Sequence, residues 1–428
     1  MNKPELHTHH NVYVLGAGFS ADAGLPTIAT FMQTLRKAGE HYKHSGDDGS
    51  ARRNAKAIAQ VLDYRLRAAG AAYRCTIDPD NIEDLFSLID TEEGSGKSNY
   101  NNDYIRQAIA ATIDFAHRTY ARDPRNVKLM SQNAPGIKEP YPGTPAEEHN
   151  NVRLLPRYDA YLAAMTGMLY EPVAGRRDTI ITFNYDTLVE EALTNLRKSY
   201  SYGFEPEEYG DGAGGGFVVV DSGCPNYLTK EPPDDDVIRV LKLHGSVNWG
   251  LRRAQSSTTH GTSVDELLVC RTFNELEDKG IDRLFIEPPT WRKGYGTPGR
   301  GIATVWNTAL RALRTASRIT IIGYSLPLTD VHFRYLIAAG LRENISLQEL
   351  LFVNPTLSES AEGYKEITSR IFQILRPELR DRGIIQFIGN ELEPELIVGN
   401  GLPVSMNKEC LFAKLNPNAG NRAAPLQW

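Results

Sequence analysis

One stretch, residues 12–27, constrains the fold of this chain more than any other. It opens with the apolar, β-forming run Val-Tyr-Val-Leu, which is typical of a buried parallel strand. Gly16 and Gly18 follow directly, and a helical pattern begins after Pro26. Glycines let the backbone approach a pyrophosphate closely, and N–H groups at a helix start attract the anion. Residues 16–21 also fit the G-x-G-x-x-G/A pattern of dinucleotide sites. The stretch predicts a phosphate-binding turn, with a plain structural turn as the alternative.

The sequence after Thr27 departs from that of an ordinary dehydrogenase. Such an enzyme has a second strand soon after the first helix, ending in an acidic residue about 20 positions beyond the glycines. Here apolar residues recur at helical spacing as far as about Tyr120, for example at Ile105, Ile109 and Ile113. We therefore predict an inserted helical module, residues 31–149, which ends in a proline-rich loop over residues 127–151.

Strands and helices alternate in the remainder of the chain. This alternation implies a parallel sheet with helices on both faces. We predict an α/β fold: a Rossmann-like doubly wound sheet formed by residues 1–30 and 150–390, the helical module, and a C-terminal tail of residues 391–428. The expected strands are residues 178–182, 237–243, 267–270, 283–286, 318–322, 350–353 and 384–388.

Charge and cysteine usage narrow the function classes. The 47 Lys and Arg residues against 53 Asp and Glu give a net charge of −6, so nucleic-acid binding is not indicated, although a local basic patch stays open. No two of the four cysteines form a C-x-x-C pair, which favours a reducing compartment and argues against a structural zinc site.

No run approaches the roughly 18 apolar residues of a membrane span, and no signal-type segment precedes the first strand. We expect a soluble, cytoplasmic protein.

Polar residues suited to chemistry follow two of the predicted strands. Asn184 and Asp186 come after residues 178–182, and His244 comes after residues 237–243. Ligands of doubly wound sheets bind outside the carboxyl ends of the strands. Asparagine offers a donor and an acceptor, and histidine can act as a base near neutral pH. We predict that the three residues share one pocket with the glycine turn. Helix capping by Asn184 and Asp186, and a His244 bonded only to backbone, remain the alternatives.

Two other motifs carry weaker signals. Residues 94–98 (Gly-Ser-Gly-Lys-Ser) look like half a P-loop, but Thr91 stands where the first glycine belongs and the preceding segment has helical spacing. Residues 323–327 (Gly-Tyr-Ser-Leu-Pro) look like G-x-S-x-G, but proline replaces the last glycine. Ser325 is expected instead to donate to a ribose or phosphate.

Taken together, the motifs resemble those of the sirtuins. Residues 16–26 resemble the sirtuin nucleotide motif, residues 182–186 its Asn-x-Asp motif, and residues 243–245 its catalytic-histidine motif. Residues 323–327 and 353–355 resemble the late strand-end loops that hold the ribose and adenine side. The ordered set is more similar still to bacterial sirtuin-like, NAD-hydrolysing effectors of anti-phage defence.

This resemblance implies a NAD+ glycohydrolase that releases nicotinamide and ADP-ribose. Asn184 would position the ribose or the attacking water, and His244 would act as the base toward a ribose hydroxyl or water. Asp186 would orient Asn184 or stabilise positive charge. NAD would be the substrate and no metal would take part. A side chain at Gly18 would occupy the space of the pyrophosphate, so Gly18→Val is expected to prevent NAD binding with little loss of stability. The residues implied to bind NAD are Gly16, Ala17, Gly18, Phe19, Ser20, Asp22, Thr27, Gly323, Tyr324, Ser325 and Asn354.

Two departures separate the chain from deacylating sirtuins. It has no C-x-x-C zinc module after His244, and Thr27-Ile28-Ala29 follows Pro26 where those enzymes carry Asp-Phe-Arg. Both favour the hydrolase over a zinc-free deacylase or ADP-ribosyltransferase. A non-catalytic NAD or ADP-ribose sensor is the other alternative. Because uncontrolled NAD hydrolysis is toxic and no ligand-sensing domain is predicted after residue 390, we expect control through a homo-oligomer or a HerA-type ATPase partner.

Overall fold

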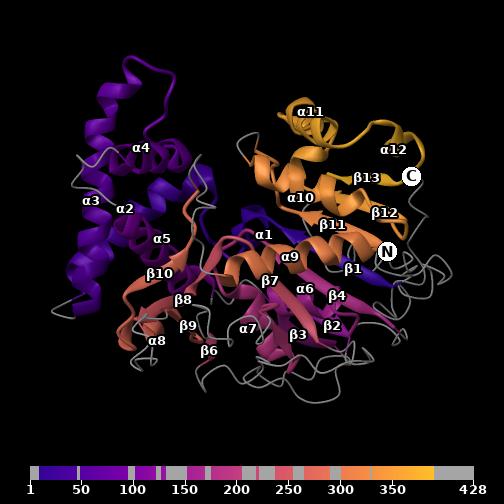
Figure 1. Ribbon diagram of the computed structural model, residues 1–428, viewed down its shortest axis with the longest axis horizontal. Helices are drawn as coiled ribbons and strands as arrows, with labels where there is room; N and C mark the ends of the chain where they lie inside the picture. Colours follow the sequence, from indigo (N-terminus) through magenta and orange to yellow (C-terminus); the bar gives the residue numbers. More distant parts are fainter. Residues whose placement is uncertain are drawn as a thin grey trace, which may run out of the picture.

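The computed structural model describes residues 9–45, 49–94, 102–121, 127–131, 152–168, 175–204, 218–220, 237–253, 265–289, 300–327 and 330–389. Its centre is a parallel sheet of seven strands in the order β13-β12-β11-β1-β4-β7-β5 (Figure 1). The strands are β1 (His10–Leu15), β4 (Arg177–Thr182), β5 (Tyr200–Ser201), β7 (Ile238–Lys242), β11 (Arg318–Ile322), β12 (Glu349–Val353) and β13 (Ile385–Ile388).

Strand β1 lies at the point where the strand order reverses. It pairs in parallel with β4 on one side and with β11 on the other. Its six residues are all buried, which is why the run from Val12 to Leu15 is continuously apolar. Crevices for ligands form at such switch points, outside the carboxyl ends of the strands. The glycine turn after β1 and the loop after β11 therefore lie side by side.

Helices complete the doubly wound arrangement. α6 (Arg157–Met165) packs against α7 (Leu188–Asn195), and α9 (Arg300–Thr315) packs against α10 (Val331–Leu341). Right-handed crossovers place these two pairs on opposite faces of the sheet. The predicted α/β fold class with a parallel sheet is confirmed. The remaining short elements of this part are α1 (Ala17–Ala21), a 3-10 turn (Pro355–Leu357), α11 (Tyr364–Ile374) and α12 (Glu378–Asp381).

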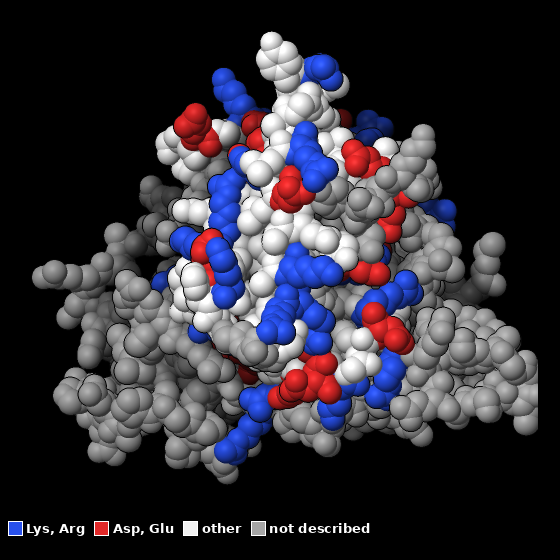
Figure 2. Space-filling view, turned by 90° about the vertical axis from the view of Figure 1, so that its left-hand side faces the viewer, with Lys and Arg blue, Asp and Glu red and all other residues white. Residues whose placement is uncertain are grey.

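Helices follow the first βα unit in the segment of the predicted helical module, whose bounds stay a prediction. It contains α2 (Ile28–His44), α3 (Gly49–Ala72), α4 (Ile82–Gly94) and α5 (Asn102–Ala116), and α5 runs into a π-helical turn (His117–Ala121). These helices lie to one side of the central sheet (Figure 1). On the face of the molecule that these helices form, Lys and Arg are interspersed with Asp and Glu (Figure 2). Ion pairs in this segment include Arg67–Asp63 and Arg65–Asp80.

A second sheet, which the sequence only partly predicts, adjoins the helical module. Its strands run in the order β10-β8-β9-β6. Strands at 267–270 and 283–286 were expected, but β8 was not. Along β8, the apolar side chains of Val247, Trp249 and Leu251 stand at every second position and are buried, and Ser246 and Asn248 between them are buried too. The bounds are β6 (Val218–Val220), β8 (Gly245–Arg253), β9 (Asp265–Val269) and β10 (Arg283–Ile286), with α8 (Phe273–Asp278) beside β8.

One prediction for the chain between the module and the sheet is wrong. Residues 127–151 were expected to be loop throughout, but β2 (Val127–Ser131) pairs antiparallel with β3 (Val152–Pro156). The pairing joins segments separated by the proline-rich stretch, so local sequence did not reveal it.

Residues 95–98 of the P-loop-like motif and the tail 391–428 lie outside the described residues. None of the helices in the described ranges is long and apolar enough to cross a membrane.

Candidate functional site

The glycines of the site hold two loops in direct backbone contact. The N–H of Gly16 donates to the carbonyl of Ile322 at 3.0 Å, and that of Gly18 donates to the carbonyl of Gly323 at 2.8 Å. A β-carbon on Gly16 would lie 2.6 Å from the Cα of Tyr324, and one on Gly18 would lie 2.7 Å from the carbonyl oxygen of Gly323. Gly323 itself has φ +61 and contacts the backbone at Gly18. The turn after β1 and the loop after β11 thus form one unit.

This contact corrects the stability expected of Gly18→Val, while the role of Gly18 in NAD binding stays a prediction. Its missing side chain makes room for Gly323, and its N–H is bonded within the protein. Gly18→Val would therefore force the two loops apart, and a small change in stability is no longer expected.

Asn184 is joined to the turn by a short relay of hydrogen bonds. Its Nδ2 donates to the carbonyl of Gly16 at 3.0 Å and to the Oγ of Ser20 at 2.9 Å. The Ser20 hydroxyl donates in turn to the Oδ2 of Asp186 at 2.8 Å. Asp186 is buried, and its other oxygen accepts from the N–H of Leu188 at the start of α7. Asp186 thus orients Asn184 through Ser20, and we call these three residues the Asn184 relay. Contact between Ser20 and a pyrophosphate stays a prediction.

His244 lies at the end of β7 within a cluster of aromatic rings. Its ring meets the edge of Phe183 at 5.1 Å between centroids and is tilted against Tyr185 at 6.3 Å. The ring of Tyr324 stacks on Phe183 at 4.8 Å. Burial, reinforced by the charge of Asp330 and a hydrogen bond to it, raises the pKa of the Tyr324 phenol well above its usual range. Tyr324 is therefore neutral, and its ring packs the loop after β11 against Phe183, the residue before Asn184.

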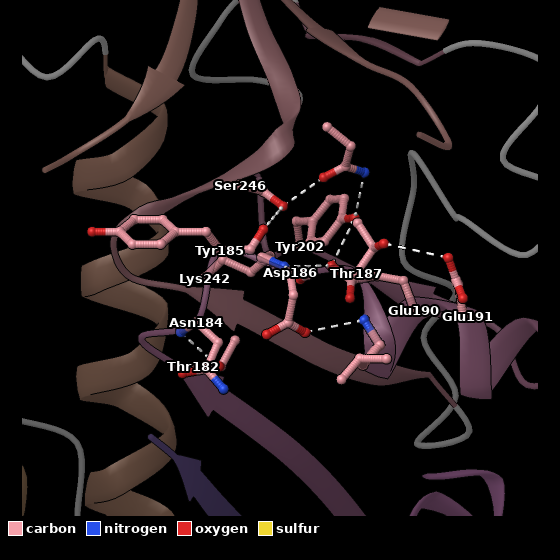
Figure 3. Close-up of polar contacts among 12 residues, drawn as sticks. Thr182, Asn184, Tyr185, Asp186, Thr187, Glu190, Glu191, Tyr202, Lys242 and Ser246 are labelled. Carbon is pink, nitrogen blue, oxygen red and sulfur yellow. Dashed lines mark hydrogen bonds and ion pairs between the residues drawn. The ribbon is translucent and has the colours of Figure 1, made fainter. Parts of the chain in front are cut away.

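A buried ion pair lies next to Asp186 (Figure 3). The Nζ of Lys242 lies 2.9 Å from the Oε1 of Glu190 and also donates to the backbone carbonyl of Asp186. The hydroxyl of Tyr202 donates to the same Glu190 oxygen at 3.1 Å. The next link is Asn248 of β8, whose Nδ2 donates to the Tyr202 hydroxyl at 3.4 Å. This network ties β7, α7 and the second sheet to the backbone of the Asn184 relay.

Three predicted cofactor-binding residues have structural roles. The ring of Phe19 is buried edge-on against Tyr158, whose hydroxyl donates to the Phe19 carbonyl at 2.7 Å. The N–H of Phe19 also bonds the Gly16 carbonyl, so its ring and its backbone are both engaged within the protein, and NAD binding by Phe19 stays a prediction. Asp22 accepts from Arg157 at 2.7 Å, and Thr27 begins α2, with its N–H donating to a side chain of that helix.

The remaining predicted residues follow the strands β1, β11 and β12. Ala17 is partly exposed in the turn, and Ser325 is exposed in the loop after β11. That loop has Leu326 at φ +50, a conformation that non-glycine residues seldom adopt and that is common at functional sites. Asn354 follows β12, and its Oδ1 accepts from the N–H and the hydroxyl of Thr356. Binding of NAD by these residues stays a prediction.

Sequence reasoning missed one titratable residue beside the site, His117. It belongs to the π-helical turn after α5, and its Nε2 lies 3.2 Å from the Oε2 of Glu191 on α7. Burial acts to lower the pKa of His117. The hydrogen bond and charge of Glu191, with the charges of Asp186 and Asp114, outweigh it, so the net pKa is raised. In the sequence, the one feature that points to this region is the end of the helical periodicity near His117.

Among the residues that the structure describes, no group of three or more His, Cys, Asp or Glu side chains could hold a metal ion.

Comparison with known proteins gives one sequence match and several structural ones. Residues 178–366 match the SIR2-like domain family. No curated protein matches the chain. A Sir2 homologue with three substitutions, in complex with 2′-O-acetyl ADP ribose, is similar over 93% of this chain and 94% of its own, with 13% identity and a TM-score of 0.36. A complex of Sir2 with a p53 peptide and NAD+ is similar over 85% and 92%, with 12% identity and a TM-score of 0.28.

Proposed function

We propose that this chain, whose residues 178–366 match the SIR2-like domain family, hydrolyses NAD+ to nicotinamide and ADP-ribose. One observation carries the proposal: the Asn184 amide is held by Gly16 and Ser20 at the sheet edge where β1, β4 and β7 end. His244 follows β7, and Phe183, the neighbour of Asn184, contacts its ring. An amide and an imidazole at the carboxyl ends of adjacent strands suit a ribose that reacts with water.

The reaction breaks the bond between C1′ of the ribose and the nicotinamide nitrogen. The electron pair of that bond passes to the ring nitrogen, which loses its positive charge, so the leaving group needs no protonation. A water oxygen bonds to C1′, and the released proton passes to His244. A positioned base of this kind contributes about 10²–10⁴-fold. Asn184 would hold the ribose or the water, and the relay through Ser20 to Asp186 fixes its orientation.

The backbone around His244 favours a small substrate over a polypeptide. The N–H of Glu287 donates to the His244 carbonyl at 2.9 Å, and the carbonyl of Phe285 lies against Gly245, which has φ +77. Strand β10 thus covers the backbone that follows His244, and an incoming peptide cannot pair with it there. This observation favours water over an acyl-lysine peptide as the acceptor.

The test is incubation of the purified full chain with NAD+, followed by chromatography. We expect nicotinamide and ADP-ribose in equal amounts, and loss of both in Asn184→Ala. Asn344→Ala is a matched control, because the Asn344 amide also donates to backbone carbonyls, those of Leu313 and Ala316, but it precedes β12 at the opposite edge of the sheet. NAD+ binding without turnover would support the sensor instead. Nicotinamide release that requires an acylated peptide would support a deacylase.

The wider role is part of the same proposal. A hydrolase of this kind depletes cellular NAD and fits an anti-phage effector controlled by a homo-oligomer or a HerA-type ATPase. Infection of cells expressing the wild type and Asn184→Ala tests this role. Protection together with a fall in NAD, both absent in the variant, is expected. Protection that survives in the variant would rule out NAD hydrolysis as its basis.

A further inference from the structure

The π-helical turn that ends α5 makes three contacts with other parts of the protein. His117 pairs with Glu191 on α7, and Arg118 donates to the Oδ1 of Asn274 on α8 at 2.7 Å. Tyr120 lies against Gly24 in the loop after α1, where φ is +78 and a β-carbon would meet its Cβ at 2.5 Å. One turn of the helical module therefore touches α7, α8 and the loop that leaves the glycine turn.

His117 is the titratable member of this turn and is largely enclosed, with 14% of its side chain exposed. Acidic groups surround it. Glu191 contacts it from α7, Asp186 acts on it from the start of α7, and Asp114 acts on it from its own helix. Arg118 offsets part of this charge, since it pairs with Asp114. The surroundings thus favour an imidazolium at this position.

His117 is connected to Asp186 through α7. Its partner Glu191 lies in the first turn of that helix, and Asp186 accepts from the Leu188 N–H at the helix start. Asp186 is the acceptor that fixes the Ser20 hydroxyl, and Ser20 in turn accepts from Asn184. The contact of His117 with α7 is therefore connected to Asn184 through the start of that helix and two hydrogen bonds.

We propose that His117 is a positioning residue of the candidate active site, through which the helical module controls the Asn184 relay. The proposal rests on the proposed function, because the relay matters only if Asn184 acts on NAD+. The proposal gives the helical module a role in the reaction. Its π-helical turn must contact α7 for the Asn184 side chain to keep its orientation.

Turnover against pH tests this role. In the wild type, nicotinamide release should fall as pH rises through the raised pKa of His117, because the imidazolium is lost. His117→Gln should lack this fall and have a kcat lower by about fivefold or more at acidic pH, the lower end of typical coupling between sites, with KM for NAD+ unchanged. The two rates should converge at high pH.

The matched control is His44→Gln. His44 belongs to the same module and lies 3.7 Å from Glu40, but both side chains are largely exposed. This variant should behave as the wild type. If His117→Gln retains the wild-type rate and alkaline fall, or if it loses rate equally at every pH while keeping that fall, the proposal is wrong.

A second measurement does not depend on turnover. NMR titration of the His117 imidazole in the full chain should give a lower pKa in Asp186→Asn and in Glu191→Gln than in the wild type. An unchanged pKa in Asp186→Asn would overturn the coupling. If the wild type releases no nicotinamide, the proposed function fails, but this titration still decides whether His117 and Asp186 are linked.

Discussion

The amide of Gly18 donates a 2.8 Å hydrogen bond to the carbonyl of Gly323, and neither residue has room for a β-carbon. The turn after β1 is therefore supported by the loop after β11, at the switch point of the sheet. The glycines of this motif are needed for contact between two loops before any ligand arrives.

Substitution of either glycine should destabilise the protein. We expect Gly18→Ala to cost about 1–3 kcal/mol of the free energy of unfolding, because the loops must separate, and Gly323→Ala to cost more, because its φ is also +61. Gly383→Ala is the matched control: its φ is +74, but nothing lies within 4 Å of the added carbon. Denaturant unfolding measures all three. A Gly18→Ala protein as stable as the wild type would contradict the contact.

His244→Gln should abolish NAD+ cleavage, with a loss of about 10²-fold or more, because glutamine cannot accept the proton. Glutamine keeps much of the volume against Phe183, so the melting temperature should change little, whereas His244→Ala should also leave a cavity. Turnover, calorimetric NAD+ affinity and melting curves are measured together. Undiminished turnover in a stable His244→Gln protein would remove His244 from the mechanism.

Lys242→Met should be among the most destabilising single changes. The substitution leaves the Glu190 carboxylate buried without its cation, at a cost of about 3–5 kcal/mol. Lys242→Met combined with Glu190→Gln should recover part of this loss. Arg67→Met breaks the exposed pair with Asp63 and should change stability by less than about 1 kcal/mol. Additive effects of the two buried substitutions would show that the residues are not coupled.

Stability should depend on Asp159, a carboxyl buried between α6 and α7. Burial raises its pKa from 3.8 to about 7, the charge of Glu191 acts in the same direction, and a hydrogen bond from Asn195 opposes them. Because the folded state keeps a proton that the unfolded chain loses, this group makes the protein less stable as pH rises from about 4 to 7.

Asp159→Asn should remove that dependence and be more stable than the wild type at pH 8, by at most about 4 kcal/mol. The difference should shrink towards pH 4. Urea unfolding across this range measures it. Parallel curves for the two proteins would show that Asp159 has an ordinary pKa.

The sequence predicted those parts of the fold whose signals are local. The apolar runs of β1, β4, β7, β11, β12 and β13 lie close to where their patterns placed them, because strands buried on both faces need continuous apolar residues. Strand β8 was missed although Val247, Trp249 and Leu251 alternate, because glycine, serine and asparagine fill the positions between them. Its length comes from pairing with β9 and β10.

The residues of the candidate site also fall into those with a local sequence signal and those without one. Asn184, Asp186 and His244 could be found because each follows a recognisable strand. The pair of His117 and Glu191 could not be found, since it joins a helix end to a helix start with no shared local pattern. The burial of Phe19 also depended on a distant residue, Tyr158 of α6.

The placement of β1 has a consequence for how the protein is made. Its two neighbours in the sheet are residues 177–182 and 318–322, so the first strand leaves the ribosome long before either partner exists. Pairings between such distant segments form slowly, since the chain between them must be closed first. The glycine turn cannot gain its support until Gly323 has been synthesised. A nascent chain therefore carries every residue of the Asn184 relay for much of translation without an assembled crevice.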